Sequence, residues 1–388
     1  MSTTHSQADV LIVGGGVIGL AVGWRAAQRG LAVEVLERGE PGGETSAVAA
    51  GMIAPVAEAD AREPALLPLA LASARAYPAF VAELEERSGL DPGYLECGTL
   101  MVARDEDEAR ALARERQIRE RLGLTVTPLA PSRARALEPA LAPVLRGALE
   151  LADDRAIDPL RLSRALAAAL AREGGRLRRA AVAEVLVSGG RAVGVRLEDG
   201  ERLLAGQLVI AAGPWSGSLE GLPSFAQVPI RPVKGQLLRL RDPDGPGLLG
   251  RVLRMQPGYL VPRGDGRYVL GASVEERGFD RAITVGPIYE LLRDAIELVP
   301  GISELRIERI VAGTRPGTPD NLPAIGRGAL DGLHWATGHY RHGILLTPLT
   351  AELAVAALCD EPASELAERV APVRFAAAER RGELLVGS

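Results

Sequence analysis

A glycine-rich turn near the start of the chain constrains the fold more than any other feature. This turn, Gly14-Gly-Gly16-Val-Ile-Gly19, follows a short apolar run at 9–13 that is typical of a buried parallel strand. Residues 18–28 then show the apolar spacing of a helix, and a second β-branched run follows at 32–36. Strand, glycine turn, helix and strand in this order predict a βαβ unit, and therefore an α/β domain built on a parallel sheet.

The same turn has the G-x-G-x-x-G spacing of a dinucleotide-binding fingerprint. The glycines permit a tight turn, close approach of the backbone to a pyrophosphate and close helix–strand contact. The helix that follows offers unpaired N–H groups and a partial positive charge to phosphates. Glu37 ends the second strand, where a carboxylate accepts hydrogen bonds from ribose hydroxyls. This fingerprint alone does not distinguish NAD from FAD.

Three later segments favour FAD. Thr45, Ser46 and the stretch Ala50-Gly51-Met52 provide small residues suited to wrapping a ligand longer than the near half of NAD. The strand-like run at 207–212 ends in Gly213 and resembles the second adenine-side strand of flavoproteins with two dinucleotide-binding folds. Residues 338–344 form a strand-to-helix junction, and we expect a helix opening near Gly343 to stabilise the reduced flavin.

The remaining patterns predict two domains. Helices are expected at 64–86, 105–122, 159–174 and 288–298, and the charge alternation of the second is typical of a solvated face. Alternating apolar residues between 228 and 313 predict a separate antiparallel sheet. We therefore expect a discontinuous, Rossmann-like FAD-binding domain with an inserted substrate domain. The first comprises 1–90, 150–226 and 314–388, and the second comprises 91–149 and 227–313.

Composition and charge exclude several classes of protein. A hydrophobic content of 47% excludes a disordered chain, and 45 basic against 50 acidic residues disfavour a nucleic-acid binder. The sequence has no apolar run long enough to cross a membrane, and 1–9 lacks the layout of a signal peptide. Cys97 and Cys359 cannot form a disulfide scaffold, so a cytoplasmic protein is expected. The four histidines lack zinc-ligand spacing, so we expect no metal site.

Five segments carry a family resemblance. They are Pro232–Gln236, Tyr259–Arg263, Gly271–Glu275, Thr314–Pro323 and Thr337–Pro348. The chain resembles, from Asp9 to about Leu358, the glycine oxidases of thiamine-thiazole biosynthesis, which belong to the D-amino-acid oxidase and sarcosine oxidase superfamily. The resemblance implies a homo-oligomeric enzyme that oxidises glycine to its imine, giving glyoxylate and ammonia, with hydrogen peroxide from oxygen. A thiazole synthase is the implied acceptor of the product.

The resemblance also implies roles for individual residues. Arg315 is similar to the arginine that pairs with the substrate carboxylate, and a guanidinium suits this task because it donates two parallel hydrogen bonds. Tyr259 is similar to a tyrosine that donates to the same carboxylate, and Arg341 to a second substrate-contacting arginine. Val182 matches a valine whose backbone holds the adenine. The family's polar residue before the tyrosine is replaced by Pro257-Gly258.

The expected FAD contacts combine the fingerprint with these matches. In chain order they are Gly14, Gly16, Val17, Ile18, Gly19, Glu37, Arg38, Thr45, Ser46, Ala50, Gly51, Met52, Val182, Gly213, His339, Tyr340, Arg341, His342, Gly343, Ile344 and Leu345. Gly313 stands where monomeric sarcosine oxidases carry a flavin-linked cysteine, so noncovalent FAD is expected.

Several alternatives stay open at this level. Hydride transfer to the flavin needs no obligatory side-chain acid or base. Glycine is the leading substrate, the alternatives are sarcosine and D-amino acids, and the electron acceptor is oxygen or another compound. A flavin-binding scaffold without turnover is the alternative from a different class, although such a protein need not keep carboxylate-binding residues. Lys234, the only lysine, could be structural, face a phosphate or activate oxygen.

Overall fold

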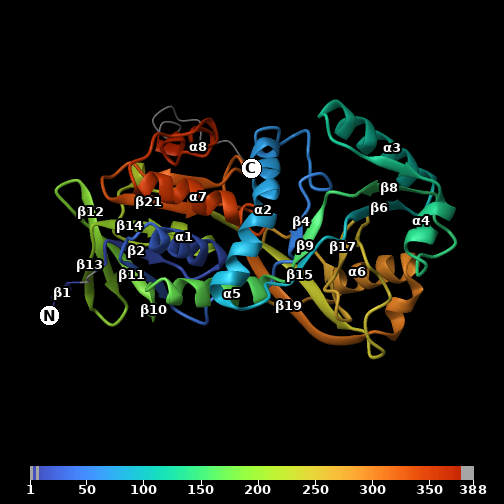
Figure 1. Ribbon diagram of the computed structural model, residues 1–388, viewed down its shortest axis with the longest axis horizontal. Helices are drawn as coiled ribbons and strands as arrows, with labels where there is room; N and C mark the ends of the chain where they lie inside the picture. The colour runs from blue at the N-terminus through green and yellow to red at the C-terminus, as the bar shows by residue number, and fades with distance from the viewer. Residues whose placement is uncertain (1–2, 6–7, 377–388) are drawn as a thin grey trace.

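The computed structural model describes residues 3–5 and 8–376 and has two lobes side by side (Figure 1). A six-stranded sheet forms the centre of the first lobe. Its strand order is β10 (Arg176–Arg179), β3 (Val33–Glu37), β2 (Val10–Val13), β14 (Gln207–Ile210), β21 (Leu333–Thr337) and β20 (Ala324–Arg327). All neighbours are parallel except β20 and β21, so the predicted parallel sheet is confirmed.

Layers on both faces bury this sheet. Val10 and Ile12 pack into a core built with helices α1 (Val17–Gln28), α2 (Leu66–Ser88), α5 (Pro159–Arg172) and α7 (Thr347–Leu358). Leu11 and Val13 point to the opposite face, towards a second sheet of four strands. The order of that sheet is β1 (Thr3–His5), β13 (Arg202–Leu204), β12 (Arg191–Leu197) and β11 (Val182–Ser188). Burial on both faces explains the uninterrupted apolar run of β2.

The second lobe is built on an eight-stranded sheet. Its order is β19 (Arg306–Gly317), β15 (Arg231–Arg241), β18 (Arg267–Gly271), β17 (Tyr259–Pro262), β16 (Val252–Arg254), β6 (Thr99–Ala103), β8 (Gly147–Leu151) and β7 (Thr127–Leu129). All neighbours are antiparallel except β16 and β6. Apolar side chains of α4 (Pro131–Leu137) and α6 (Val285–Leu298) pack with this sheet. The shared sheet supports grouping 91–149 with 227–313, and the domain division stays our proposal.

The remaining elements are short, apart from one long helix. They are β4 (Met52–Ile53), β9 (Arg155–Ile157) and β5 (Tyr94–Leu95), which form a three-stranded sheet, α3 (Glu106–Arg121), α8 (Glu365–Arg369), and 3-10 helices at Gly213–Ser218, Ser224–Ala226 and Pro300–Glu304. Within α3 the expected solvated face has one exception, because Arg119 is buried. The last predicted piece of the FAD-binding domain, 377–388, lies outside the described residues.

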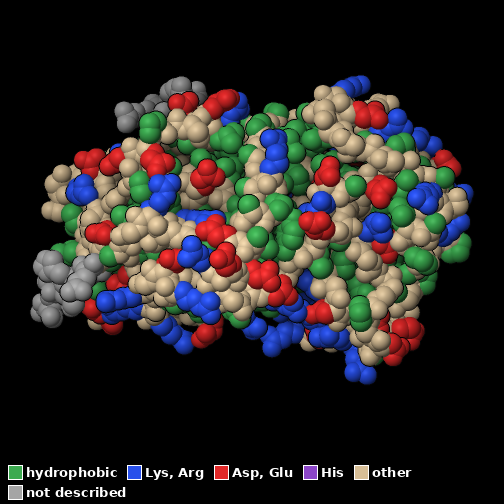
Figure 2. All heavy atoms as spheres, in the orientation of Figure 1, with side chains coloured by type: hydrophobic (Ala, Val, Ile, Leu, Met, Phe, Trp, Pro, Cys, Tyr) green, Lys and Arg blue, Asp and Glu red, His purple; other side chains and the backbone are tan. Residues whose placement is uncertain are grey.

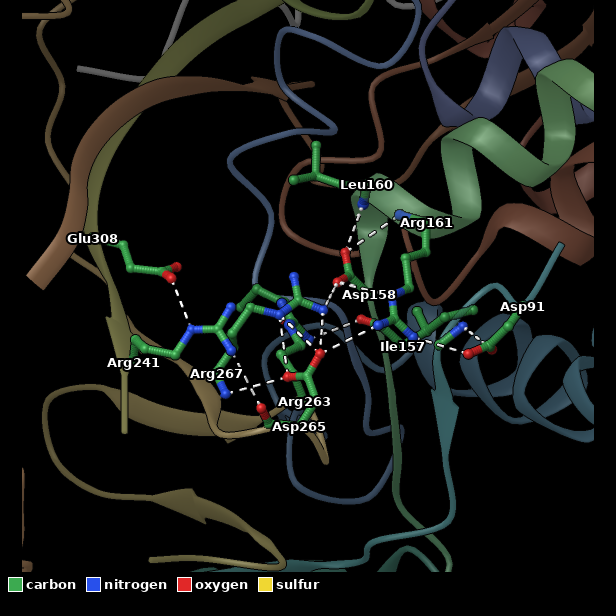
Figure 3. Close-up of polar contacts among 12 residues, drawn as sticks. Asp91, Ile157, Asp158, Leu160, Arg161, Arg241, Arg263, Asp265, Arg267 and Glu308 are labelled. Carbon is green, nitrogen blue, oxygen red and sulfur yellow. Dashed lines mark hydrogen bonds and ion pairs between the residues drawn. The ribbon is translucent and has the colours of Figure 1, made fainter. Parts of the chain in front are cut away.

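A polar network joins the two lobes where α5 begins (Figure 3). The Asp158 side chain caps α5 by accepting from the backbone N–H groups of Leu160 and Arg161, and it also pairs with Arg267 at 3.0 Å. Arg263 donates to the carbonyls of Ile157 (2.9 Å) and Ala50 (2.7 Å), and burial lowers its pKa to about 10. This network fixes residue 50 against the second lobe.

The surface carries charges of both signs. Figure 2 shows arginine side chains (blue) interspersed with Asp and Glu over the face in view. Among the described residues, no helix is both long and apolar enough to cross a membrane. Within residues 3–5 and 8–376, no group of His, Cys, Asp and Glu side chains is arranged to hold a metal ion.

Candidate active site

One long cavity runs between the lobes. At one end it is lined by Glu37 and Val182, and at the other by Tyr259 and Arg315. Every predicted FAD contact except Gly19 lines this cavity. Gly19 lies behind the turn, where an added Cβ would be 1.9 Å from the carbonyl oxygen of Gly14. This glycine therefore serves close packing of the helix on the turn, and the prediction of a direct FAD contact is not supported.

Close backbone packing and hydrogen bonds to two side chains fix the conformation of the glycine turn. Gly14 has a φ of +108°, and an added Cβ would lie 2.5 Å from the carbonyl oxygen of Ala211. Glu37 accepts from the N–H groups of Gly15 (2.7 Å) and Gly39 (2.8 Å), and Ser46 Oγ accepts from the N–H of Val17 (3.0 Å). The helix N-terminus has no side-chain cap at Gly16 and lines the cavity, which suits a phosphate group.

A second turn, 339–345, borders the cavity from the C-terminal side. The hydroxyl groups of Tyr77 and Ser73 donate to the carbonyls of Ile344 (2.6 Å) and Leu345 (2.7 Å). Burial lowers the pKa of His339 to about 3 and that of His342 to about 4, so both side chains are neutral at physiological pH. The regular helix α7 begins at Thr347, later than the predicted opening near Gly343.

Arg315 is the least compensated charge in the cavity. Its Nη1 donates to the carbonyls of Lys234 (3.3 Å) and Ser273 (3.2 Å), and among the described residues it forms no ion pair. Gly235 gives the guanidinium its space, because an added Cβ would lie 2.5 Å from both Nη atoms. Tyr259 is next to it, and burial raises the pKa of Tyr259 although the charge of Arg315 acts the other way. A guanidinium and a neutral phenol thus meet at this end.

Arg341 lines the same cavity but is already paired. Its guanidinium lies 3.1 Å from Glu63, 3.7 Å from Glu58 and 4.0 Å from Asp60, and Nε donates to His342 Nε2 at 3.1 Å. These carboxylates balance the charge of Arg341, whereas Arg315 has no carboxylate partner among the described residues. Direct contact of Arg341 with substrate stays a prediction.

Sequence reasoning missed three charged residues that line the cavity, Glu44, Glu58 and Arg254. Glu58 and Arg254 lie 3.3 Å apart, and the charges of Arg254 and Arg341 hold the pKa of Glu58 below its usual value although burial acts to raise it. The segment before Glu58 is fixed from both sides. Arg119 donates to the carbonyls of residues 56 and 57, and Asp154 accepts from their N–H groups.

Lys234 lies outside the cavity lining. Its Nζ is 3.2 Å from Asp280 Oδ2 and 3.6 Å from Glu275 Oε2, and the side chain is 1% exposed. These ion pairs favour a structural role over a phosphate-facing or oxygen-activating one.

The residues present fit a dinucleotide cofactor with a substrate beside it. The turn at 14–17 would hold the pyrophosphate, and Glu37 would hold the ribose of the adenosine half. Val182 would lie against the adenine, and the turn at 339–345 against the flavin. Arg315 and Tyr259 then stand at the far end of the cavity, where a small carboxylate would bind.

Comparison with known proteins agrees with this geometry. The family model described as "FAD dependent oxidoreductase" matches residues 9–357. The chain is 38% identical over 353 residues to a glycine oxidase of Geobacillus kaustophilus (strain HTA426), covering 90% of this chain and 92% of the relative. It is 36% identical over 376 residues to the bifunctional protein ThiO/ThiG of Synechocystis sp., covering 96% of this chain but only 54% of that relative. The crystal structure of glycine oxidase from Geobacillus kaustophilus has a TM-score of 0.85 at 35% identity, covering 93% of this chain and 96% of that one.

Proposed function

The chain belongs to the FAD-dependent oxidoreductase family, and from this premise we propose that it oxidises glycine and other small amines. Glycine loses two electrons and two protons to give its imine, which water hydrolyses to glyoxylate and ammonia. Oxygen takes up the two electrons and two protons and becomes hydrogen peroxide. FAD, when bound, supplies the hydride acceptor at its N5 atom.

One observation carries this proposal, namely that the guanidinium of Arg315 forms no ion pair within the described part of the chain and lies beside the neutral phenol of Tyr259. A carboxylate is the ligand that such a pair binds best, because both groups donate hydrogen bonds and one carries a compensating charge. Binding the carboxylate end orients the α-carbon towards the flavin side of the cavity. Since the amine of the substrate enters deprotonated, no side chain of the chain is needed as an obligatory acid or base.

The fused relatives support a link to thiazole synthesis. Because this chain spans about half the length of the bifunctional ThiO/ThiG protein, it corresponds to one part of that relative. We propose that a thiazole synthase receives the imine formed here. We further propose a cytoplasmic homo-oligomer with noncovalent FAD, on the resemblance of its motifs to those of glycine oxidases.

Anaerobic mixing with candidate substrates tests the activity. Glycine, sarcosine, D-alanine and D-proline are added to the holoenzyme, and the flavin absorbance is followed. Glycine is expected to bleach the flavin and air to restore the colour. If none of the four compounds bleaches the flavin, the proposed amine-oxidase activity is rejected. If air fails to restore the colour, the enzyme is a dehydrogenase that uses another electron acceptor.

Arg315→Ala tests the carboxylate contact. The variant is expected to raise KM for glycine by roughly 100-fold while FAD stays bound, because a charge-assisted pair is lost only at the substrate. Unchanged kinetics would place the carboxylate elsewhere in the cavity.

A further inference from the structure

A buried polar network lies behind the guanidinium of Arg315. Lys234 and Gln236 are alternate residues of β15, so their side chains share one face of the strand, and Gly235 between them faces Arg315. Lys234 is 1% exposed and Gln236 is 0% exposed. Two fully buried polar side chains in a strand need partners, because each would otherwise cost free energy on folding.

Those partners all belong to one segment, Ser273–Thr284, which we call the rim segment. The Lys234 ammonium pairs with Asp280 and Glu275, and its backbone N–H and carbonyl both bond to Glu275 at 2.9 Å. The Gln236 amide donates to Glu275 Oε1 (2.8 Å) and Thr284 Oγ1 (2.9 Å) and accepts from the N–H of Thr284 (2.8 Å). Lys234 and Gln236 therefore fasten both ends of the rim segment.

The rim segment has few other attachments. Residues 276–286 are exposed, and Val274 is 64% exposed although it lines the cavity. Two residues that line the cavity also contact the segment. Phe279 stacks on Trp215 with ring centroids 5.8 Å apart, and Arg281 pairs with Glu44 at 2.8 Å. An exposed ion pair contributes little and a single ring stack contributes modestly, so the buried network is the main determinant of the position of the segment.

The rim segment provides one of the two carbonyl groups that accept hydrogen bonds from Arg315. One carbonyl that accepts from its guanidinium belongs to Ser273, and the other belongs to Lys234 itself. Ser273 is held in turn, because its Oγ accepts from the Gln236 N–H (2.9 Å) and donates to Glu275. Loosening the ammonium–carboxylate contact would therefore let both carbonyls move, and the guanidinium with them.

We propose that Lys234 is a positioning residue for substrate binding, which aligns Arg315 by fastening the rim segment through Glu275 and Asp280. This inference rests on the proposed function, in which Arg315 binds the substrate carboxylate. It predicts that substrate affinity responds to Lys234, although the lysine touches neither substrate nor flavin.

Three variants of the holoenzyme test the proposal. Lys234→Met removes the ammonium, Lys234→Arg keeps a cation, and Asp280→Asn weakens the contact at a partner whose side chain is 49% exposed. Arg241→Met is the matched control, because it removes an ion pair to Glu308 (2.9 Å) from the same strand far from the rim segment. For each variant, kcat and KM for glycine are measured, and the rim peptide is followed by hydrogen exchange without substrate.

Lys234→Met is expected to raise KM roughly 10- to 100-fold with kcat changed less than about twofold, since misplacing a binding group by 1 Å has effects of this order. Asp280→Asn is expected to raise KM less, and Lys234→Arg to restore part of the loss. Hydrogen exchange of 273–284 should become faster in Lys234→Met and stay unchanged in Arg241→Met.

The outcomes distinguish this inference from the proposed function. If Arg315→Ala raises KM but neither Lys234→Met nor Asp280→Asn does, Lys234 does not position the guanidinium of Arg315. Faster exchange of the rim peptide with an unchanged KM also rejects a positioning role. If Arg315→Ala itself leaves KM unchanged, the proposed carboxylate site is wrong. If Lys234→Met fails to fold, the KM of Asp280→Asn decides: an increase supports the positioning role and an unchanged value rejects it.

Discussion

Replacing Gly235 with alanine would move the carboxylate-binding guanidinium without removing it. The added Cβ would lie 2.5 Å from both Nη atoms of Arg315 and 2.7 Å from Cζ. An ordinary contact between carbon and nitrogen is roughly 1 Å longer, so the guanidinium must withdraw by about that much. The guanidinium is the far end of a flexible side chain, and Gly235 does not have the left-handed φ that only glycine tolerates. Alanine should therefore fit the strand without strain.

The size of the effect follows from this displacement. A misplacement of about 1 Å costs roughly 100-fold in kcat/KM, which corresponds to about 2.7 kcal/mol of transition-state stabilisation. Because the carboxylate contact is present in both the bound substrate and the transition state, the loss should fall mainly on KM. Folding stability should be unchanged or rise by about 0.4–1 kcal/mol, since alanine restricts the unfolded chain more than glycine does.

Oxygen consumption with glycine and thermal unfolding together check this prediction. Gly147→Ala on β8 is the matched control, because it adds the same methyl group to the same sheet where nothing lies within 4 Å. KM should rise in Gly235→Ala alone, with both variants as stable as the parent. A KM equal to that of the control would refute the proposal that the substrate carboxylate binds to the guanidinium of Arg315. A large loss of stability would show that the guanidinium cannot withdraw.

Two further predictions concern stability and the cofactor. Burial raises the pKa of Asp154 to about 7, so between pH 4 and 7 the folded protein keeps a proton that the unfolded chain has released. The contribution of Asp154 to the free energy of unfolding is therefore fully present below pH 4, and up to about 4 kcal/mol of it is lost as the pH rises towards 7. In urea unfolding measured over this pH range, Asp154→Asn should lack this decrease in the free energy of unfolding. Acid precipitation should release all flavin into the supernatant, because Gly313 replaces the cysteine of covalent flavoproteins, and flavin retained on the pellet would contradict this.

The sequence was informative where function depends on local patterns. The turn at 14–19 could be predicted because its strand, glycines and helix are contiguous, and Glu37 ends the very next strand. Arg315 and Tyr259 were identified from family motifs, whereas their arrangement with Gly235 depends on strand pairing across β15 and β19. Both residues line the cavity, in agreement with the expected roles.

Charged residues brought together by tertiary structure could not be predicted. Glu58 follows no motif, and its partner Arg254 lies almost two hundred positions further along the chain. The charge pattern of α3 is typical of a solvated helix, and nothing local marks Arg119 as the one residue that turns inward to hold residues 56 and 57. Such contacts depend on packing between residues far apart in the sequence, which hydrophobic periodicity and motif spacing do not report.

The burial of Lys234 has a practical consequence for labelling chemistry. Since it is the only lysine in the sequence and its side chain is 1% exposed, amine-directed reagents meet no exposed side-chain amine on this protein. Reductive methylation with an isotopic label would place its only side-chain reporter on the amine of Lys234 once that amine is released, and the rate of incorporation at this residue would measure how often the rim segment opens. Immobilisation or crosslinking of the native protein through side chains would instead have to use its arginines, carboxylates or cysteines.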